Sequence, residues 1–498
     1  MKIALIVTIL QIFSKIFGFI RELTLSYFYG VSEVSDAFLV AFALPSALFL
    51  IINPAITAGY IPIYNKIKKK EGREEANLFT INCINIILIL CFIISLFFYF
   101  NPEIILKIFA TGFKGKKFFI TLLLSRISVW SIILISVNAI FITYLNANNS
   151  FILPSFVSMF LNFGIIIGIF LSEKYGYTFL SFGILMGFFM QFILLYIFAK
   201  RKGLNYKPYL NLSDKYTKEI YAVSIIMLIS AGADQFNSIV DRSLASYLTT
   251  GSISALNYAQ RLNSFIISIF ILPIISLIYP KLSNLALENR LEDFFNLFYK
   301  TISFFTFITA PLVFGGMYFS KEVTGLLFLR GAFDYKALNM TSSALFYYLI
   351  GIIFTAYREV LFRAFYSLGK PKIPVKNTIM LLGFNIIFNL ILSRYMGAPG
   401  IALATSISSI IATSVLMAKL IKLKKHNTFK ILKNISKVLI CSIFMIILLN
   451  MLEKIYPIEM EVVNLFFHIL IGAMIFIGSA FVLKVEELKI LKRYKKWI

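Results

Sequence analysis

Charged side chains interrupt several of the longest apolar runs in this 498-residue chain. A charge at the centre of a bilayer costs about 2.5–3.5 kcal/mol on insertion scales unless it faces a cavity or finds a partner, so such residues are candidates for function. Arginine is the commonest type among them. The candidates are Lys15, Arg21, Glu22, Arg126, Asp234, Asp241, Arg242, Arg261, Arg358, Glu359 and Arg363, with Asp36 at the start of the second run.

The arginines indicate chemistry with an anion. A guanidinium group is planar, permanently charged and able to bind two phosphate oxygens at once, so a cavity lined with arginine suits a phosphate or diphosphate and suits a cationic drug poorly. The alternative is that these residues reach the membrane surface from helix ends or pair with adjacent acids. We favour that alternative for Arg358 and Arg363, near a cytoplasmic loop, and binding for Arg21 and Arg261. The secondary candidates are Arg126, Arg242 and Arg358.

A second group of polar residues could hold a cation. Asn385 and Asn389 are four residues apart and therefore share one face of a helix, where carboxamides facing hydrocarbon would be costly. Together with Asp241 and Thr405 they could form an oxygen cage for Na⁺. The alternative is hydrogen bonding between neighbouring helices, which Ser, Thr and Asn commonly provide in membranes.

Enzymatic chemistry lacks the residues that it needs. The two histidines are His426 in a basic loop and His468 in an apolar run, and the cysteines Cys83, Cys91 and Cys441 lie in apolar runs without CxxC spacing. No GxxxxGK[ST] phosphate-binding loop is present. We therefore expect no catalytic residues, no resident metal and no cofactor, and transport driven by the membrane potential or a Na⁺ gradient.

The composition is that of a membrane protein. Hydrophobic residues make up 59% of the chain and charged residues 14%. The formal net charge of +25 would suggest nucleic acid in a soluble protein. Here most of the cations lie in short loops between apolar runs, where they are expected to anchor the chain to anionic lipids, so we expect no nucleic-acid partner.

Apolar runs long enough to span a bilayer recur along the whole chain, and about fourteen are expected. They fall at 3–28, 34–65, 77–100, 118–145, 153–172, 178–199, 219–248, 252–280, 293–318, 339–368, 376–395, 400–421, 435–454 and 461–483. With the N-terminus in the cytoplasm, the inner loops carry about three times as many Lys and Arg residues as the outer ones. We therefore expect both termini to be cytoplasmic.

Two halves of the chain repeat. Arg21 lies nine residues before Gly30, Arg242 lies nine before Gly251, and the second pair follows the first by 221 residues. This shift spans six helices, an even number, so the repeats enter the membrane from the same side, as in two-lobed alternating-access transporters. We expect an all-α polytopic protein with two parallel six-helix lobes at 1–200 and 219–421, two appended helices at 435–483 and a basic cytoplasmic tail at 484–498.

Four strings resemble the MurJ/MviN family of lipid II flippases, within the multidrug/oligosaccharidyl-lipid/polysaccharide exporter superfamily. They are SKIFGFIRE at 14–22, SDAFLVAFALP at 35–45, VDRSLASYLTTGSISALNYAQRL at 240–262 and GIALATS at 400–406. The resemblance covers nearly the whole chain, including the two appended helices.

The resemblance implies that cationic residues in a central cavity hold the diphosphate of an undecaprenyl-diphosphate-linked glycan. By position, Arg21 matches the arginine of the first-helix motif, Asp36 the acid of a TDAF-like motif and Arg261 the arginine that ends a YADRL-like motif. Lys15 stands where the family usually has another arginine. We expect these four residues to form the diphosphate site.

Some positions depart from the family pattern, which carries basic residues and acids there. They are Ala43, Phe49, Leu50, Pro54, Gln260 and Ser264. These side chains would contact the glycan headgroup, so the departures leave a different lipid-diphosphate-linked glycan as an alternative substrate.

The expected function is a flippase that moves lipid II from the inner to the outer leaflet of the bacterial cytoplasmic membrane by alternating access, in contact with anionic lipids and with cell-wall synthesis enzymes. The alternatives are a flippase for another polyprenyl-linked surface polysaccharide and a cation-coupled multidrug exporter. A drug exporter is expected to place carboxylates, rather than arginines, in its cavity.

Overall fold

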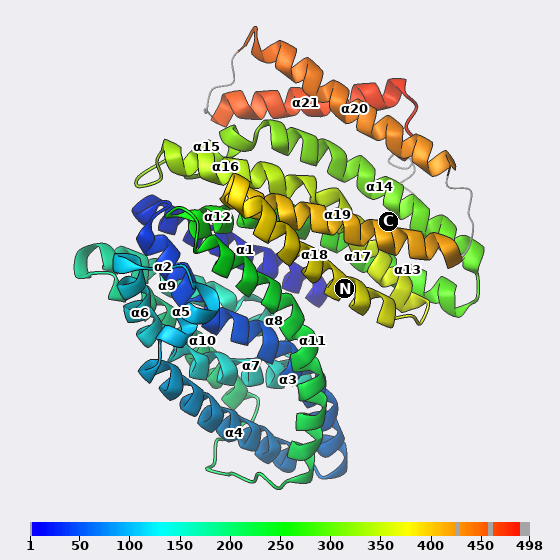
Figure 1. The fold of residues 1–498 in the computed structure, drawn as a ribbon. Helices are drawn as coiled ribbons and strands as arrows, with labels where there is room; N and C mark the ends of the chain where they lie inside the picture. The colour runs from blue at the N-terminus through cyan, green and yellow to red at the C-terminus, as the bar shows by residue number, and fades with distance from the viewer. Residues whose placement is uncertain (1, 424–428, 457–461, 489–498) are drawn as a thin grey trace. The chain divides into compact units, whose positions relative to one another are not determined.

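The computed structural model describes residues 2–423, 429–456 and 462–488, and every regular element in these ranges is a helix (Figure 1). Residues 489–498 of the predicted basic tail lie outside the described residues. In the first half the helices are α1 (Lys2–Tyr29), α2 (Glu33–Ala41), α3 (Ala43–Lys70), α4 (Arg73–Phe100), α5 (Glu103–Phe109), α6 (Gly115–Ser128), α7 (Ser131–Ala147), α8 (Ile152–Phe156), α9 (Ser158–Tyr175) and α10 (Thr178–Arg201).

The second half repeats this order and adds two helices. Its elements are α11 (Lys215–Ala245), α12 (Ser252–Ile266), the π-helix η1 (Ile267–Ile271), α13 (Leu272–Leu287), α14 (Leu291–Tyr318), α15 (Ser320–Phe328), α16 (Tyr335–Ile350), α17 (Ile352–Ser367), α18 (Lys372–Met396), α19 (Ala398–Leu423), α20 (Phe429–Glu453) and α21 (Val462–Val482).

Many of these helices are long enough to cross a bilayer. Ten in the described ranges have the length and apolar composition of a span, and the number is twelve if each of two bent helix pairs counts as one span. Helices α1 and α11, of 28 and 31 residues, also exceed the roughly 20 residues that a span requires. The predicted fold class, an all-α polytopic membrane protein, is confirmed, whereas the count of fourteen stays a prediction.

The two bent pairs occupy equivalent places in the two halves. The pair α6 and α7 is bent by 43°, and the pair α16 and α17, about 220 residues later, is bent by 42°. Each break exposes carbonyl groups that hydrocarbon cannot satisfy. Ser95 of α4 donates to the carbonyl of Val129 at 3.0 Å, and Ser406 of α19 donates to the carbonyl of Tyr347 at 2.6 Å. Hydroxyl groups of neighbouring helices therefore stabilise both bends.

The chain divides into two compact units, Met1–Ser254 with Arg330–Phe333 and Ala255–Leu329 with Asp334–Ile498. Helix α11, which the predicted bounds assign to the second lobe, belongs to the first compact unit, where it packs along α3. The bounds of the two lobes stay a prediction. Asn82 of α4 donates to Thr217 of α11 at 2.9 Å, and Thr111 hydrogen-bonds Ser243 of α11 at 2.8 Å. Polar contacts near both ends of α11 therefore bind it to the first unit.

In the second unit, the appended pair α20 and α21 packs together, and α20 lies along α14 (Figure 1). Asn434 of α20 donates to Ser303 of α14 and to both carboxylate oxygens of Glu487, at 2.6–2.8 Å. Glu487 is buried. This polar contact fixes the segment after α21 to the start of α20 and to α14, since a buried carboxylate needs its donors.

Helices α9 and α10 cross at backbone contact because glycines face each other. A Cβ on Gly164 would lie 2.4 Å from Gly187 Cα, and a Cβ on Gly168 would lie 2.6 Å from Gly183 Cα. In lipid the hydrophobic effect does not drive helices together, because the lipid tails are as apolar as the side chains. Small residues at such crossings allow the close van der Waals packing that holds the helices together instead.

We expect Gly187→Ala to lower the thermal unfolding midpoint of the purified protein in detergent. The new methyl group would lie 2.6 Å from the carbonyl oxygen of Leu161, and overpacking of this kind costs about 1–3 kcal/mol. Gly383→Ala is the matched control, because nothing lies within 4 Å of its Cβ. Equal midpoints for the two variants would contradict the proposed role of the crossing.

Candidate functional site

Asp36 accepts four hydrogen bonds, all from residues outside its own helix. It is fully buried in the first turn of α2, which Ser32 caps. Its Oδ1 accepts hydrogen bonds from the backbone N–H and the hydroxyl of Ser254, at 2.7 and 2.8 Å. Its Oδ2 accepts from the backbone N–H of Gly251 at 2.8 Å and from Lys117 Nζ at 2.5 Å. We call this arrangement the Asp36 cap.

The Asp36 cap replaces a helix cap that α12 cannot make for itself. Gly251 precedes the first residue of α12 and has no side-chain oxygen to offer the free N–H groups of the first turn. The carboxylate of Asp36 accepts from the N–H of Gly251, just before the helix, and from the N–H of Ser254 in its first turn. Its negative charge is favourable at the positive end of a helix dipole. Asp36 thereby ties α2 to the first turn of α12, residues more than 200 positions apart in the sequence.

Lys117 is the residue that the sequence analysis missed. It is buried, donates to Asp36 and lies 4.0 Å from the ring centroid of Phe113, a cation–π distance. It lies next to Lys116 just before an apolar run. A lysine at such a position usually extends to water, so the sequence does not distinguish a buried lysine from an exposed one. A carboxylate inside the membrane needs a cationic partner, and the sequence alone does not show which cation supplies it.

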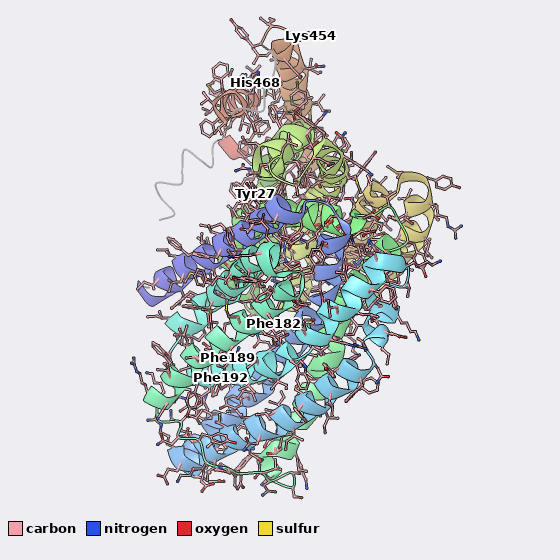
Figure 2. The ribbon with its side chains drawn as sticks, turned by 90° about the vertical axis from the view of Figure 1, so that its left-hand side faces the viewer. Tyr27, Phe182, Phe189, Phe192, Lys454 and His468 are labelled. Carbon is pink, nitrogen blue, oxygen red and sulfur yellow. The ribbon has the colours of Figure 1, made fainter. Side chains whose placement is uncertain are left out.

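Glycines around the Asp36 cap bring backbones into direct contact. A Cβ on Gly251, at φ +89°, would lie 2.2 Å from Val31 Cγ1. A Cβ on Gly30, at φ +54°, would lie 2.2 Å from the carbonyl oxygen of Ala332, whose N–H donates to Tyr27 at 2.8 Å. Figure 2 labels Tyr27 near the end of α1. Both glycines satisfy two demands at once, a left-handed backbone and a close approach.

Arg21 is also buried, and its charge is matched locally. It forms an ion pair with the adjacent Glu22, and its guanidinium carbon lies 5.8 Å from the ring centroid of Phe42. Glu22 is adjacent to Arg21 in the sequence, so this pair matches the alternative that such arginines pair with adjacent acids. A buried guanidinium with one acid and one aromatic face still has donors to offer to a phosphate.

The other predicted cations differ in exposure. Lys15, Arg126 and Arg261 are exposed, whereas Arg242 and Arg358 are half-buried. Arg358 lies 5.5 Å from the ring centroid of Phe362. Arg21 lies in the first unit and Arg261 in the second. The joint binding of a diphosphate by Lys15, Arg21, Asp36 and Arg261 stays a prediction.

The polar residues predicted to hold a cation form a hydrogen-bonded chain in the second unit. Asn389 donates to Asn385 Oδ1 at 2.8 Å, Asn385 donates to Thr405 at 3.2 Å, and Thr405 donates to the carbonyl of Ile401 at 3.1 Å. This is the interhelical hydrogen bonding that the sequence left open as an alternative, and it joins α18 to α19. Asp241 belongs to the first unit, where Asn237 is 3.5 Å from its Oδ2. The cation cage stays a prediction.

Comparison with known proteins identifies the family. The family model described as lipid II flippase MurJ matches residues 25–471, which is most of the chain. The chain belongs to the lipid II flippase MurJ family. The resemblance found in the sequence is thereby confirmed.

Members of this family align over nearly the whole chain. A probable lipid II flippase MurJ of Thermotoga maritima is 28% identical over 485 residues, covering 97% of this chain and 96% of the relative. One of Aquifex aeolicus is 29% identical over 439 residues, covering 87% and 85%. A solved lipid II flippase MurJ in an inward closed conformation has a TM-score of 0.85 at 26% identity, covering 97% of this chain and 100% of that one.

The fold extends beyond the MurJ family. A multidrug resistance MATE transporter of the MOP superfamily, in an inward-facing conformation, has a TM-score of 0.68 at 15% identity, covering 85% of this chain and 99% of that one. At this identity the likeness shows the fold alone.

We expect Lys117→Met to destabilise the protein by about 3 kcal/mol, because removing one partner of a buried ion pair leaves the other charge uncompensated. The measurement is the unfolding midpoint in detergent, with the exposed neighbour Lys116→Met as control. Adding Asp36→Asn to Lys117→Met should recover part of the loss. If Lys117→Met and Lys116→Met unfold together, the buried pair does not hold the Asp36 cap.

Proposed function

We propose that this chain is a flippase that transfers lipid II, an undecaprenyl-diphosphate-linked peptidoglycan precursor, from the inner to the outer leaflet of the bacterial cytoplasmic membrane. The observation that carries the proposal is its membership of the lipid II flippase MurJ family over residues 25–471. The whole-length likeness to a solved MurJ structure supports it. The excess of Lys and Arg in alternate loops supports an orientation with both termini in the cytoplasm.

The deciding experiment is complementation of a bacterial strain depleted of its own lipid II flippase. Rescue of growth supports lipid II as substrate. Failure to rescue, with the protein inserted at normal abundance, would favour another polyprenyl-linked glycan, an alternative that rests on the positions that depart from the family pattern. Efflux of a cationic dye would instead favour the multidrug exporter, whose fold this chain shares.

Arg21 and Arg261 are proposed to bind the diphosphate. Attraction between a guanidinium and a phosphate is weak in water and strengthens as a cavity narrows and loses water, so each charge-assisted contact contributes about 1.5–3 kcal/mol. Because basic residues expected near the start of α3 are replaced by Ala43, Phe49 and Leu50, these two arginines would carry most of the interaction.

We expect Arg21→Ala or Arg261→Ala to abolish exposure of the lipid-linked glycan in the outer leaflet at matched protein abundance. Replacement by lysine should rescue only part of the activity, because the two-pronged contact is lost. Arg363→Ala is the control that should be tolerated: Arg363 is bound to Glu359 at 3.3 Å, one turn away on its own helix. Full activity in both alanine variants would refute this binding role.

Alternating access is proposed as the mechanism, with the Asp36 cap as one contact that changes. If the first turn of α12 leaves Asp36 during the cycle, the carboxylate loses three of its four donors. Lys117 lies on α6 and would remain, so the buried carboxylate would keep a counter-charge in the second state. Bistable contacts of this kind allow a packed protein to switch between arrangements.

The energy source is proposed to be the membrane potential or a Na⁺ gradient. In proteoliposomes we expect flipping without ATP, and a reduced rate when an ionophore collapses the gradient. Thr405→Val would remove one oxygen of the proposed Na⁺ cage while keeping the side-chain shape, so it should reduce Na⁺ stimulation if the cage operates. A requirement for ATP on this chain alone would contradict the proposal.

A further inference from the structure

An apolar hollow lies on the side of the first unit where α7, α9 and α10 meet. Its volume is about 580 Å³. The wall comes from Leu134 of α7, from Gly168 and Leu171 of α9, and from residues between Phe179 and Phe189 of α10. Figure 2 shows Phe182 and Phe189 one after the other along α10, and the two rings are about half exposed, at 48% and 50%.

The glycines that bring α9 and α10 together also create the hollow. Gly168 and Gly183 both line it, and each backbone lies too close to the other for a side chain to fit between them. The missing side chains leave the floor of the hollow as bare backbone. The large rings of α10 stand around it as walls. The hollow is therefore a consequence of the helix crossing.

The chemistry of the wall decides what can fill this space. All nine lining residues are apolar, and a water molecule needs two to four polar partners, so water is excluded. The half-exposed rings belong to a helix that is long and apolar enough to span the membrane, so they face hydrocarbon. An empty space there would forfeit dispersion contacts on every wall atom.

The length of the hollow matches one leaflet. The turn between α9 and α10 carries exposed Tyr175 and Tyr177, and Lys174 Nζ lies 5.5 Å from the ring centroid of Tyr175. Tyr and Lys side chains of this kind mark the boundary between hydrocarbon and headgroups. From Phe179 to Phe189 the helix rises about 15 Å, which is half of the roughly 30 Å hydrocarbon thickness.

We propose that this hollow is a binding site for one acyl chain of a membrane phospholipid, whose headgroup phosphate lies at the depth of Lys174. A phospholipid acyl chain occupies one leaflet from the headgroup to the midplane, as the hollow does. A polyprenyl chain is much longer than one leaflet and would leave most of its length outside. In the orientation proposed above, the leaflet is the outer one.

The test uses the full-length protein in vesicles that contain a phospholipid with a photoreactive diazirine in the middle of one acyl chain. After illumination, peptide mass spectrometry maps the labelled residues. We expect labelling to concentrate in the stretches 168–171 and 179–189. Met186→Trp, which fills the hollow with an indole, should reduce that labelling by roughly tenfold. Ile193→Trp is the matched control, because Ile193 is exposed on the same helix outside the hollow, and it should leave the labelling unchanged.

Each other outcome would overturn the proposal. Labelling spread evenly over the exposed helices, or equal in the two tryptophan variants, would show bulk lipid contact rather than a site. Displacement of the label by a small mole fraction of undecaprenyl phosphate would assign the hollow to a polyprenyl chain. Crosslinks from this segment to a second copy of the chain would assign it to a protein interface. If Met186→Trp fails to fold, the distribution of labelled peptides in the unmodified protein still tests the proposal.

Discussion

The need to satisfy every backbone polar group without water governs this structure. In hydrocarbon an unpaired N–H or C=O group costs several kcal/mol, so the chain spans the membrane as helices and repairs each place where a helix ends or bends. Ser95 of α4 and Ser406 of α19 donate to carbonyl groups at the two bends. The Asp36 cap is the same repair made with a charged group, because Gly251 gives the first turn of α12 no cap of its own.

The buried charges follow a second rule, that a charge away from water needs a partner. Asp36 has Lys117 and a helix end, and Arg21 has Glu22 and the face of Phe42. The two cases differ in what remains available. Asp36 is saturated by four donors, whereas a guanidinium bound to one carboxylate keeps other N–H groups for a second anion. This difference gives Asp36 a role in positioning the start of α12, whereas binding of a diphosphate by Arg21 or Asp36 stays a prediction.

Glycine has a different use in each part of the first unit. Around the Asp36 cap, Gly30 and Gly251 combine a left-handed backbone with close contact to another segment. Any other residue at these positions would strain the backbone, even if its side chain had room. Between α9 and α10 the glycines are helical, and they serve close packing. Gly168 and Gly183 of this crossing also line the apolar hollow, so the same glycines pack the two helices and shape a surface that faces lipid.

The sequence by itself determined the class of this protein. Its apolar runs, the distribution of Lys and Arg, the shift of 221 residues between Arg21 and Arg242, and four family-like strings predicted an all-α polytopic protein of the MurJ/MviN type. The membrane class depends on the length and composition of individual segments, because each span must be apolar over the thickness of the bilayer.

Only the tertiary structure decided which charged side chains are paired and which residues pair with them. The partners of Asp36 come from residues 117, 251 and 254, and α11 packs along α3, which lies far from it in the sequence. The sequence around a lysine before an apolar run is the same whether its side chain reaches water or a buried carboxylate. Which of the two it reaches depends on helices that are far away in the chain, as Asp36 is from Lys117.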